Sequence, residues 1–317
     1  MRGIASRILD GTWLGGHPDE GVRSDDPNDR IAHELRRDLR GQYAMFAWLD
    51  HVDVKEHNTL DMWVTDPADP GRHYVKHYAI DFGKALGVMA SDKLDPRQGH
   101  TFYLDYGDML ASLASAGLRE RSWEGRSAPE LRGVGLYEAL RFQSGGWRAN
   151  TQVNVAFATA DRFDGFWAAK ILIRFTGEQL RAIVETGRLT DPRSSRYLVD
   201  TLVARQRATA RYWFQQVAPL DGFAIHTRAL CFDDLAIRHR FASATETSYV
   251  VTAYDSAGRP LGKPGTPLAD VCTPSTGRGY QMTRIRVVRA GVTRSAIVHL
   301  APDPATVTQR VIGLWRE

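Results

Sequence analysis

The chain has 317 residues, of which 43% are hydrophobic and 25% are charged, and its formal net charge is +4. This length suits one large or two medium domains, and the composition is typical of a soluble globular protein. The basic residues are mostly arginines spread along the chain, and no block of them is interleaved with aromatic residues. A nucleic-acid surface is therefore not indicated. No apolar run is long enough to span a membrane.

The first predicted element is a helix that runs to about Leu49. Asn28 or Asp29 can cap its beginning, because both side chains accept hydrogen bonds from free backbone N–H groups. Apolar residues recur at near-helical spacing, at Ile31, Leu35, Leu39, Phe46 and Leu49. We expect a buried helix that leads directly into the polar loop after it.

Two β-rich runs, residues 61–65 and 73–80, follow this polar loop. The segment between them, residues 66–71, is dense in Asp, Pro and Gly. Strand-forming runs on both sides of a turn-rich segment predict a β-hairpin. The polar loop at residues 51–58 and a second acidic segment at residues 81–83 should then lie at the strand ends of one hairpin.

Three histidines in this region, His57, His73 and His77, do not have the spacing of a metal-binding motif. His73 and His77 share one face of the second predicted strand, because side chains alternate along a strand. We expect these two residues to be solvated or to contribute to packing.

The spacing His51-x-Asp53-x-Lys55-x-x-Asn58, followed by Asp81-Phe-Gly83, resembles the catalytic loop and the metal-binding segment of the protein-kinase-like superfamily. The resemblance implies an active site that uses ATP and Mg²⁺ as cofactors. It also implies the helical C-lobe of that fold, here with a longer insertion between the two segments than protein kinases usually have.

The resemblance also implies a role for each polar residue. Asp53 would be the catalytic base that positions the acceptor hydroxyl, and Lys55 would contact the γ-phosphate. Asn58 and Asp81 would be the Mg²⁺ ligands, through amide and carboxylate oxygens, and together with Lys55 they would bind the nucleotide. Gly83 would allow the chain to turn away at once. The loop histidine is expected to be a scaffold residue.

Other features of protein kinases are missing. No lysine precedes Lys55, and the early pair Gly15-Gly16 does not form a G-x-G-x-x-G pattern. Fewer than about 35 residues precede the first helix, which is too short for a five-stranded lobe. The sequence therefore resembles a kinase C-lobe without its N-lobe.

Three explanations for the missing lobe stay open: a gene model begun at an internal Met, a truncated or degenerate paralogue, or a partner protein that supplies the N-lobe. We favour the first, because Met1–Leu9 has neither the pattern of a signal peptide nor that of a capped terminus. The expected location is the cytoplasm by default, unless an export signal lies upstream.

Residues 161–215 have a helical pattern. Aromatic and aliphatic residues form a helical stripe at Phe163, Phe166, Trp167, Ile171 and Phe175. A capping box, Thr176-Gly-Glu-Gln179, predicts a second helix start. Asp191-Pro192 predicts a third, because proline suits the first position of a helix. These helices fit the lower part of a kinase C-lobe.

After Pro219 the pattern changes to β-rich runs separated by Gly, Pro, Asp and Ser, at residues 224–232, 247–254, 281–289, 295–300 and 311–315. They predict a small antiparallel sandwich of roughly 90 residues. Cys231 and Cys272 match neither a zinc motif nor a disulfide framework. They could pair if the strands that hold them are neighbours.

The predicted fold class is thus α+β, with a mainly helical, kinase-like C-lobe at residues 1–218 and an antiparallel β domain at 219–317. The chain is also similar to a family of uncharacterised bacterial proteins. The matching segments are Asp25–Asp29, His51–Asp61, Asp81–Gly87 and Phe166–Lys170. This second resemblance supports the fold and names no substrate.

Two functional hypotheses follow. The first is an atypical kinase-like phosphotransferase that uses ATP and Mg²⁺, with an unidentified protein, small molecule or sugar as acceptor. The second is a non-catalytic pseudokinase or interaction module that lacks the nucleotide-binding lobe. A lysine and glycine-rich strands encoded upstream of Met1 would favour the first, and a stop codon there would favour the second.

Overall fold

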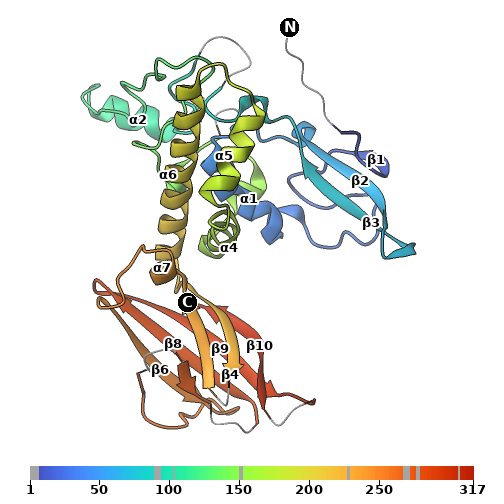
Figure 1. Ribbon diagram of the computed structural model, residues 1–317, viewed down its shortest axis with the longest axis vertical. Coiled ribbons are helices and arrows are strands. Elements are labelled where there is room, and N and C mark those ends of the chain that lie inside the picture. Colours follow the sequence, from blue (N-terminus) through green and yellow to red (C-terminus); the bar gives the residue numbers. More distant parts are fainter. Residues whose placement is uncertain are drawn as a thin grey trace. The chain divides into compact units, whose positions relative to one another are not determined.

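The computed structural model describes residues 7–88, 94–102, 104–149, 153–226, 229–266, 272–275, 279–305 and 308–317. The chain forms two compact units, the first ending at Thr209 and the second beginning at Ala210 (Figure 1). This division lies earlier in the chain than the expected boundary after residue 218. Helices and antiparallel sheets occupy separate segments, so the fold class is α+β, as predicted.

The first unit contains a three-stranded antiparallel sheet with the order β1-β2-β3. Its strands are β1 (Thr12–Gly15), β2 (Thr59–Asp66) and β3 (Asp69–Ala79). The predicted hairpin is confirmed, because β2 and β3 pair along their length with Thr59 opposite Ala79. The loop before β2 and the segment after β3 therefore meet at the same end of the hairpin.

Helix α1 (Arg37–Leu49) begins later than the sequence indicates. Asp29, one of the two expected caps, accepts a hydrogen bond from the backbone N–H of Arg23 and pairs with Nε2 of His33. A short 3₁₀ turn, η1 (His33–Leu35), lies between that contact and the helix. The predicted helix start is wrong, because the carboxylate of Asp29 is held by partners outside the helix.

The other helices in the described part of the first unit are α2 (Tyr106–Ala114), α3 (Val155–Ala158), α4 (Arg162–Leu172) and α5 (Gly177–Thr186). Helix α6 (Pro192–Gln216) begins in the first unit and ends in the second. Further 3₁₀ turns are η2 (Glu56–Asn58), η3 (Phe82–Lys84) and η4 (Ser144–Gly146). The predicted capping box of α5 is confirmed, since Thr176 and Gln179 accept hydrogen bonds from each other's backbone N–H groups. Among the described residues, no helix has both the length and the hydropathy to cross a membrane.

The polar loop after α1 is anchored by apolar side chains at alternate positions. Val52 and Val54 are buried and belong to a core cluster with Phe46 of α1 and Trp147. Between these two valines lies Asp53, which is only 5% exposed. The apolar alternation therefore fixes the backbone on both sides of a buried carboxylate.

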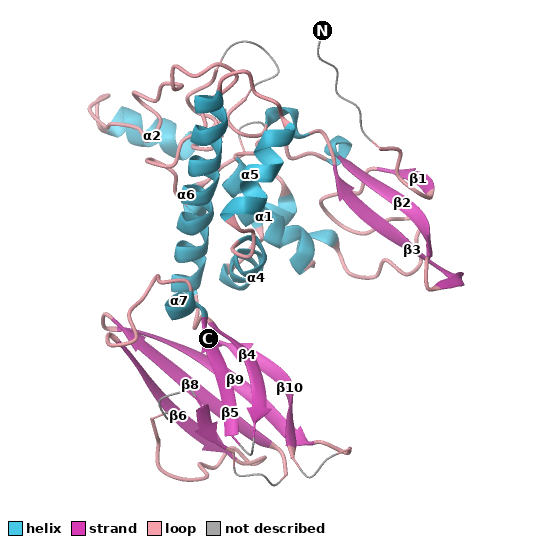
Figure 2. Cartoon of the chain, viewed as in Figure 1, coloured by secondary structure: helices cyan, strands magenta, loops and turns pink. Residues whose placement is uncertain are grey.

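The described residues of the second unit contain two antiparallel sheets (Figure 2). One has the order β10-β9-β8-β6 and comprises β6 (Thr247–Tyr254), β8 (Gln281–Arg289), β9 (Val292–Pro302) and β10 (Gln309–Arg316). The other has the order β4-β5-β7 and comprises β4 (Leu220–His226), β5 (Ala229–Asp234) and β7 (Cys272–Pro274), with the short helix α7 (Leu235–Arg238) after β5.

Both sheets of the second unit contribute to one apolar core. Leu230 and Phe232 of β5 pack in it together with Ile285 of β8 and Val298 of β9. Side chains of two sheets that fill a common core make a β-sandwich. The antiparallel β domain predicted after Pro219 is therefore present, although the predicted run at 224–232 belongs to two strands, β4 and β5.

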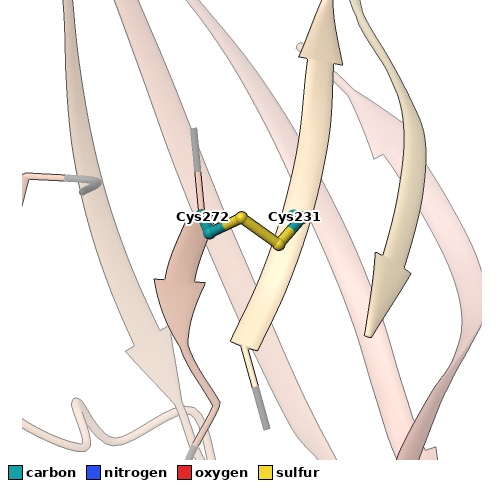
Figure 3. The surroundings of a disulfide bond; sticks show 2 residues. All are labelled: Cys231 and Cys272. Atoms are coloured by element: carbon teal, nitrogen blue, oxygen red, sulfur yellow. A yellow bond between two sulfur atoms is a disulfide. The ribbon is translucent and has the colours of Figure 1, made fainter. Parts of the chain in front are cut away.

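Cys231 of β5 and Cys272 of β7 form a disulfide bond (Figure 3). The two residues lie directly opposite each other in the strand register, so the strands that hold them are indeed neighbours. The bond closes a loop with a sequence separation of 41 residues. Closing such a loop restricts the unfolded chain and should stabilise the fold by about 4 kcal/mol.

Replacing both cysteines, Cys231→Ser with Cys272→Ser, should lower the free energy of unfolding of the second unit by about 2–4 kcal/mol. Thermal unfolding followed by circular dichroism measures this loss. A reducing agent should lower the melting temperature of the wild type in the same way and should leave that of the double variant unchanged. Equal melting temperatures of oxidised wild type and double variant would show that the bond adds no stability.

Candidate functional site

The loop at residues 51–58 begins at the end of α1 with a left-handed residue. Asp50, the C-cap of the helix, has a φ of 52°. The backbone N–H of His51 then donates to the carbonyl of Phe46, which closes the helix end. The side chain of His51 is 1% exposed, and its ring lies 4.7 Å from that of Phe46. The loop histidine is therefore packed into the core, and burial lowers its pKa.

The carboxylate of Asp53 lies between two lysines. Its Oδ2 is 3.3 Å from Nζ of Lys55 and 3.2 Å from Nζ of Lys84. Burial raises the pKa of Asp53, but hydrogen bonds from Asn58, Lys84 and Lys55 outweigh it and bring the pKa below its ordinary value. The carboxylate therefore stays ionised at neutral pH. Lys84 was not predicted as a site residue.

Asn58 is buried and joins the loop to the end of the hairpin. Its Nδ2 donates to the backbone carbonyl of Asp53 at 2.8 Å. Its own carbonyl accepts a hydrogen bond of 2.9 Å from the backbone N–H of Ile80. Asp81 directly follows Ile80. The hydrogen bond between Ile80 and Asn58 therefore places the backbones of two predicted ligands, Asn58 and Asp81, close to each other.

Asp81 is an exposed residue in the left-handed conformation, with a φ of 53°. Its carboxylate accepts a hydrogen bond from the backbone N–H of Gly83 at 3.3 Å. Left-handed backbone is uncommon for residues other than glycine, although aspartate tolerates it better than most. Gly83 lies in the turn η3, and its φ is not positive. The left-handed backbone conformation, which glycine adopts most easily, is thus found at Asp81 and not at Gly83.

Phe82 connects the two predicted segments. Its ring lies over that of His51, with the centroids 4.9 Å apart. Together with the ion pair between Asp53 and Lys84, this contact brings the segment after β3 onto the loop after α1. Residues from both sequence motifs therefore form one cluster in the folded chain.

A small cleft contains three of the four predicted site residues. Asp53, Lys55 and Asn58 line it together with His17, Asp19 and the aromatic ring of Phe157. Asp81 and Lys84 are not part of this lining. The chain thus brings the base and phosphate-contact candidates into a common cleft, while Asp81 lies outside it on the exposed turn.

The chain matches no protein-family model, no curated protein and no solved structure. The arrangement of its side chains therefore carries the functional argument.

A second polar cluster, which the sequence analysis did not identify, lies inside the three-stranded sheet. Asp61 of β2 is completely buried and stands opposite His77 of β3. Its Oδ1 is 2.5 Å from Nδ1 of His77 and 3.1 Å from Nδ1 of His17, and its Oδ2 accepts from Arg23 at 2.8 Å. Burial raises the pKa of Asp61, but the hydrogen bonds from His17 and His77 outweigh it and hold the pKa well below its ordinary value.

One sequence signal could have revealed part of this cluster. Asp61 occupies a position in a predicted strand where neighbouring residues are apolar, and an aspartate is rarely buried without partners. His77 lies opposite it once the hairpin register is known. No comparable signal marks His17 or Arg23, because apolar residues do not recur at helix or strand spacing in the segments that contain them.

Proposed function

We propose that the first unit is an atypical, kinase-like phosphotransferase that uses ATP and Mg²⁺. One observation carries this proposal: the two predicted segments converge so that the carboxylate of Asp53 lies between Lys55 and Lys84. Phosphoryl transfer needs a group that orients the acceptor hydroxyl, oxygen ligands for a metal ion and positive charge beside the phosphate. An ionised aspartate next to two lysines supplies the first and the third of these.

Two further residues, Asn58 and Asp81, offer oxygen atoms that suit a magnesium ion. Because Nδ2 of Asn58 donates to a backbone carbonyl, its amide oxygen is the atom left for a cation. The carboxylate of Asp81 is exposed, and Asp81 directly follows Ile80, whose backbone N–H donates to the carbonyl of Asn58. Mg²⁺ prefers such hard oxygen ligands and keeps several waters, so one amide and one carboxylate are enough. Bound Mg²⁺ and ATP would supply the phosphoryl group and neutralise its charge.

The residues of the chain have distinct roles in this proposal. Asp53 orients the acceptor hydroxyl and takes its proton late, so a carboxylate of low pKa is sufficient. Lys55 and Lys84 are both partly exposed and can turn from Asp53 to phosphate oxygens. The ring contact of Phe82 with His51 holds the metal-binding turn against the loop.

Calorimetric titration of the full chain with ATP and Mg²⁺ tests the proposal. We expect metal-dependent binding in the wild type and none in Asp81→Ala. Asp69→Ala is the matched control, because Asp69 is also exposed and also accepts from the backbone N–H two residues later. Its binding should equal that of the wild type. Absence of binding by the folded wild-type chain would contradict the proposal.

A non-catalytic module is the second candidate. It is favoured by one observation: the described strands of the first unit form a single sheet, β1-β2-β3. None of these strands belongs to a glycine-rich hairpin of the kind that covers the nucleotide phosphates in protein kinases. In this case the chain would act through its helical and β surfaces, or with a partner that supplies the N-lobe. The same titration discriminates, because a non-catalytic chain without that lobe should not bind ATP.

A further inference from the structure

The buried cluster of His17, Asp61 and His77 brings together three possible metal ligands. Asp61 belongs to β2 and His77 to β3, while His17 follows β1. One ligand atom from each residue can be chosen so that all three atoms lie within 4.8 Å of one another. The paired strands β2 and β3 and the segment after β1 thus position two imidazole nitrogens and a carboxylate oxygen around a common point.

Additional hydrogen bonds made by the candidate ligands hold their ligand atoms in place. Arg23 binds Oδ2 of Asp61, which leaves Oδ1 directed at the two imidazoles. The backbone N–H of His17 donates to the hydroxyl of Thr59 at 3.0 Å. Such outer contacts are typical of metal sites, where they orient the ligands.

We propose that His17, Asp61 and His77 bind a divalent transition-metal ion such as zinc. Zinc is commonly held by imidazole nitrogen and carboxylate oxygen, and sites with three protein ligands keep a fourth position open. With bonds of about 2.0–2.1 Å, tetrahedral ligand atoms lie roughly 3.3 Å apart. The 3.1 Å between His17 and Asp61 is close to this value. The 2.5 Å between His77 and Asp61 widens when an ion replaces the proton between them.

A hydrogen-bonded network without an ion would use the same side chains. In such a network each histidine donates its Nδ1 proton to Asp61. A contact of 3.5 Å from Arg36 to Nε2 of His77 would fit that arrangement. Arg36 also has two carboxylate partners, Asp38 at 3.0 Å and Asp29 at 3.7 Å. The His77 proton can therefore move to Nε2 on metal binding without leaving Arg36 unpaired.

The ligand set distinguishes this ion from the magnesium of the proposed phosphotransferase. Imidazole nitrogen favours zinc and related metals, whereas Mg²⁺ takes oxygen ligands. The cluster also adjoins the cleft of Asp53, because His17 lines both. Gly16 permits the segment of His17 to lie against the loop at residues 51–58, since a Cβ at position 16 would lie 2.5 Å from the carbonyl oxygen of Glu56. The metal proposal does not rest on the proposed function and is tested without nucleotide.

Zinc titration of the full chain, without an affinity tag and after dialysis against a chelator, tests the site. We expect one zinc ion per chain, a higher melting temperature with zinc, and no competition from excess Mg²⁺. Substitution of a ligand, His17→Gln or His77→Gln, should weaken zinc binding by more than about 100-fold. His73→Gln is the matched control, because His73 is an exposed residue of the same strand that stacks on Trp63. Its affinity should be that of the wild type.

Cobalt provides a readout that does not depend on any variant. Co²⁺ in a tetrahedral site with nitrogen ligands absorbs strongly in the visible range, and zinc should abolish this absorption by displacement. Zinc and cobalt binding by the wild-type chain tests the proposal even where a ligand substitution prevents folding. Absence of zinc and cobalt binding by the folded wild type would overturn the proposal. Wild-type affinity in both His17→Gln and His77→Gln would overturn it as well.

Discussion

Asp53→Asn is expected to reduce phosphoryl transfer by about 10²–10⁴-fold, the usual contribution of a positioned acid–base group. The amide has nearly the same shape, so the buried loop should keep its structure. It cannot accept a proton from an attacking hydroxyl, and it leaves Lys55 and Lys84 without their shared carboxylate. Hydrolysis of radiolabelled ATP and labelling of the chain itself measure transfer without knowledge of the acceptor.

The diagnostic result is a separation of transfer from binding. Asp53→Asn should bind ATP and Mg²⁺ in the calorimeter like the wild type, because the metal ligands assigned to Asn58 and Asp81 are unchanged. Asp69→Asn, a change of the same kind at the exposed first residue of β3, should affect neither quantity. Full transfer activity in Asp53→Asn would refute the role of Asp53, and loss of binding in this variant would show that Asp53 acts on the nucleotide instead.

The sequence predicted the local elements of the site better than its contacts. Two β-rich runs on both sides of a turn-rich segment were enough to locate the hairpin, and this hairpin brings Asn58 next to Ile80. Lys84 could not be identified in the same way. Its ion pair with Asp53 depends on the register of the hairpin and on the left-handed backbone at Asp81, and neither is visible in residue spacing.

One wrong prediction and one open question about the fold have the same cause. The expected helix cap at Asp29 failed because Arg23 and His33 use its carboxylate. The pairing of Cys231 with Cys272 stayed open because β7 has only three residues and gives a weak strand signal. Both features depend on partners that folding brings together from other segments. Local propensity contains no information on such partners.

The buried cluster around Asp61 shows the limit most clearly. A strand pattern indicates which face of a hairpin is inward, and so it could have marked Asp61 and His77. His17 and Arg23 reach the same carboxylate from irregular segments. Their positions follow from the packing of backbone between β1 and α1, which composition and periodicity do not describe.

Arg205→Met is expected to destabilise the first unit by about 3–5 kcal/mol, the range measured when a buried charged partner is removed. Arg205 of α6 is 3% exposed. Its guanidinium donates to the carbonyls of Ala47 and Trp48 at 2.6 and 2.9 Å and to that of Glu138 at 2.9 Å. The last carbonyls of a helix lack the usual donor four residues later, so Arg205 provides charged donors at the end of α1.

Methionine preserves apolar volume but offers no hydrogen, so these buried carbonyls would lose their charged donor. The carbonyls of Trp48 and Ala47 keep other donors, the hydroxyl of Tyr137 at 2.7 Å and the backbone N–H of Asp50 at 3.2 Å. The expected loss therefore comes mainly from the buried carboxylate of Asp50, whose Oδ1 lies 3.8 Å from Nη2 of Arg205 and would lose this charged partner. Urea unfolding followed by tryptophan fluorescence measures it. Arg196→Met on an exposed position of the same helix is the matched control and should change stability by less than about 0.5 kcal/mol. Similar losses in both variants would show that helix α6, and not the end of α1, determines the effect. A large loss in Arg205→Met alone would show that the end of α1, from which the loop of Asp53 continues, depends on Arg205 for its stability.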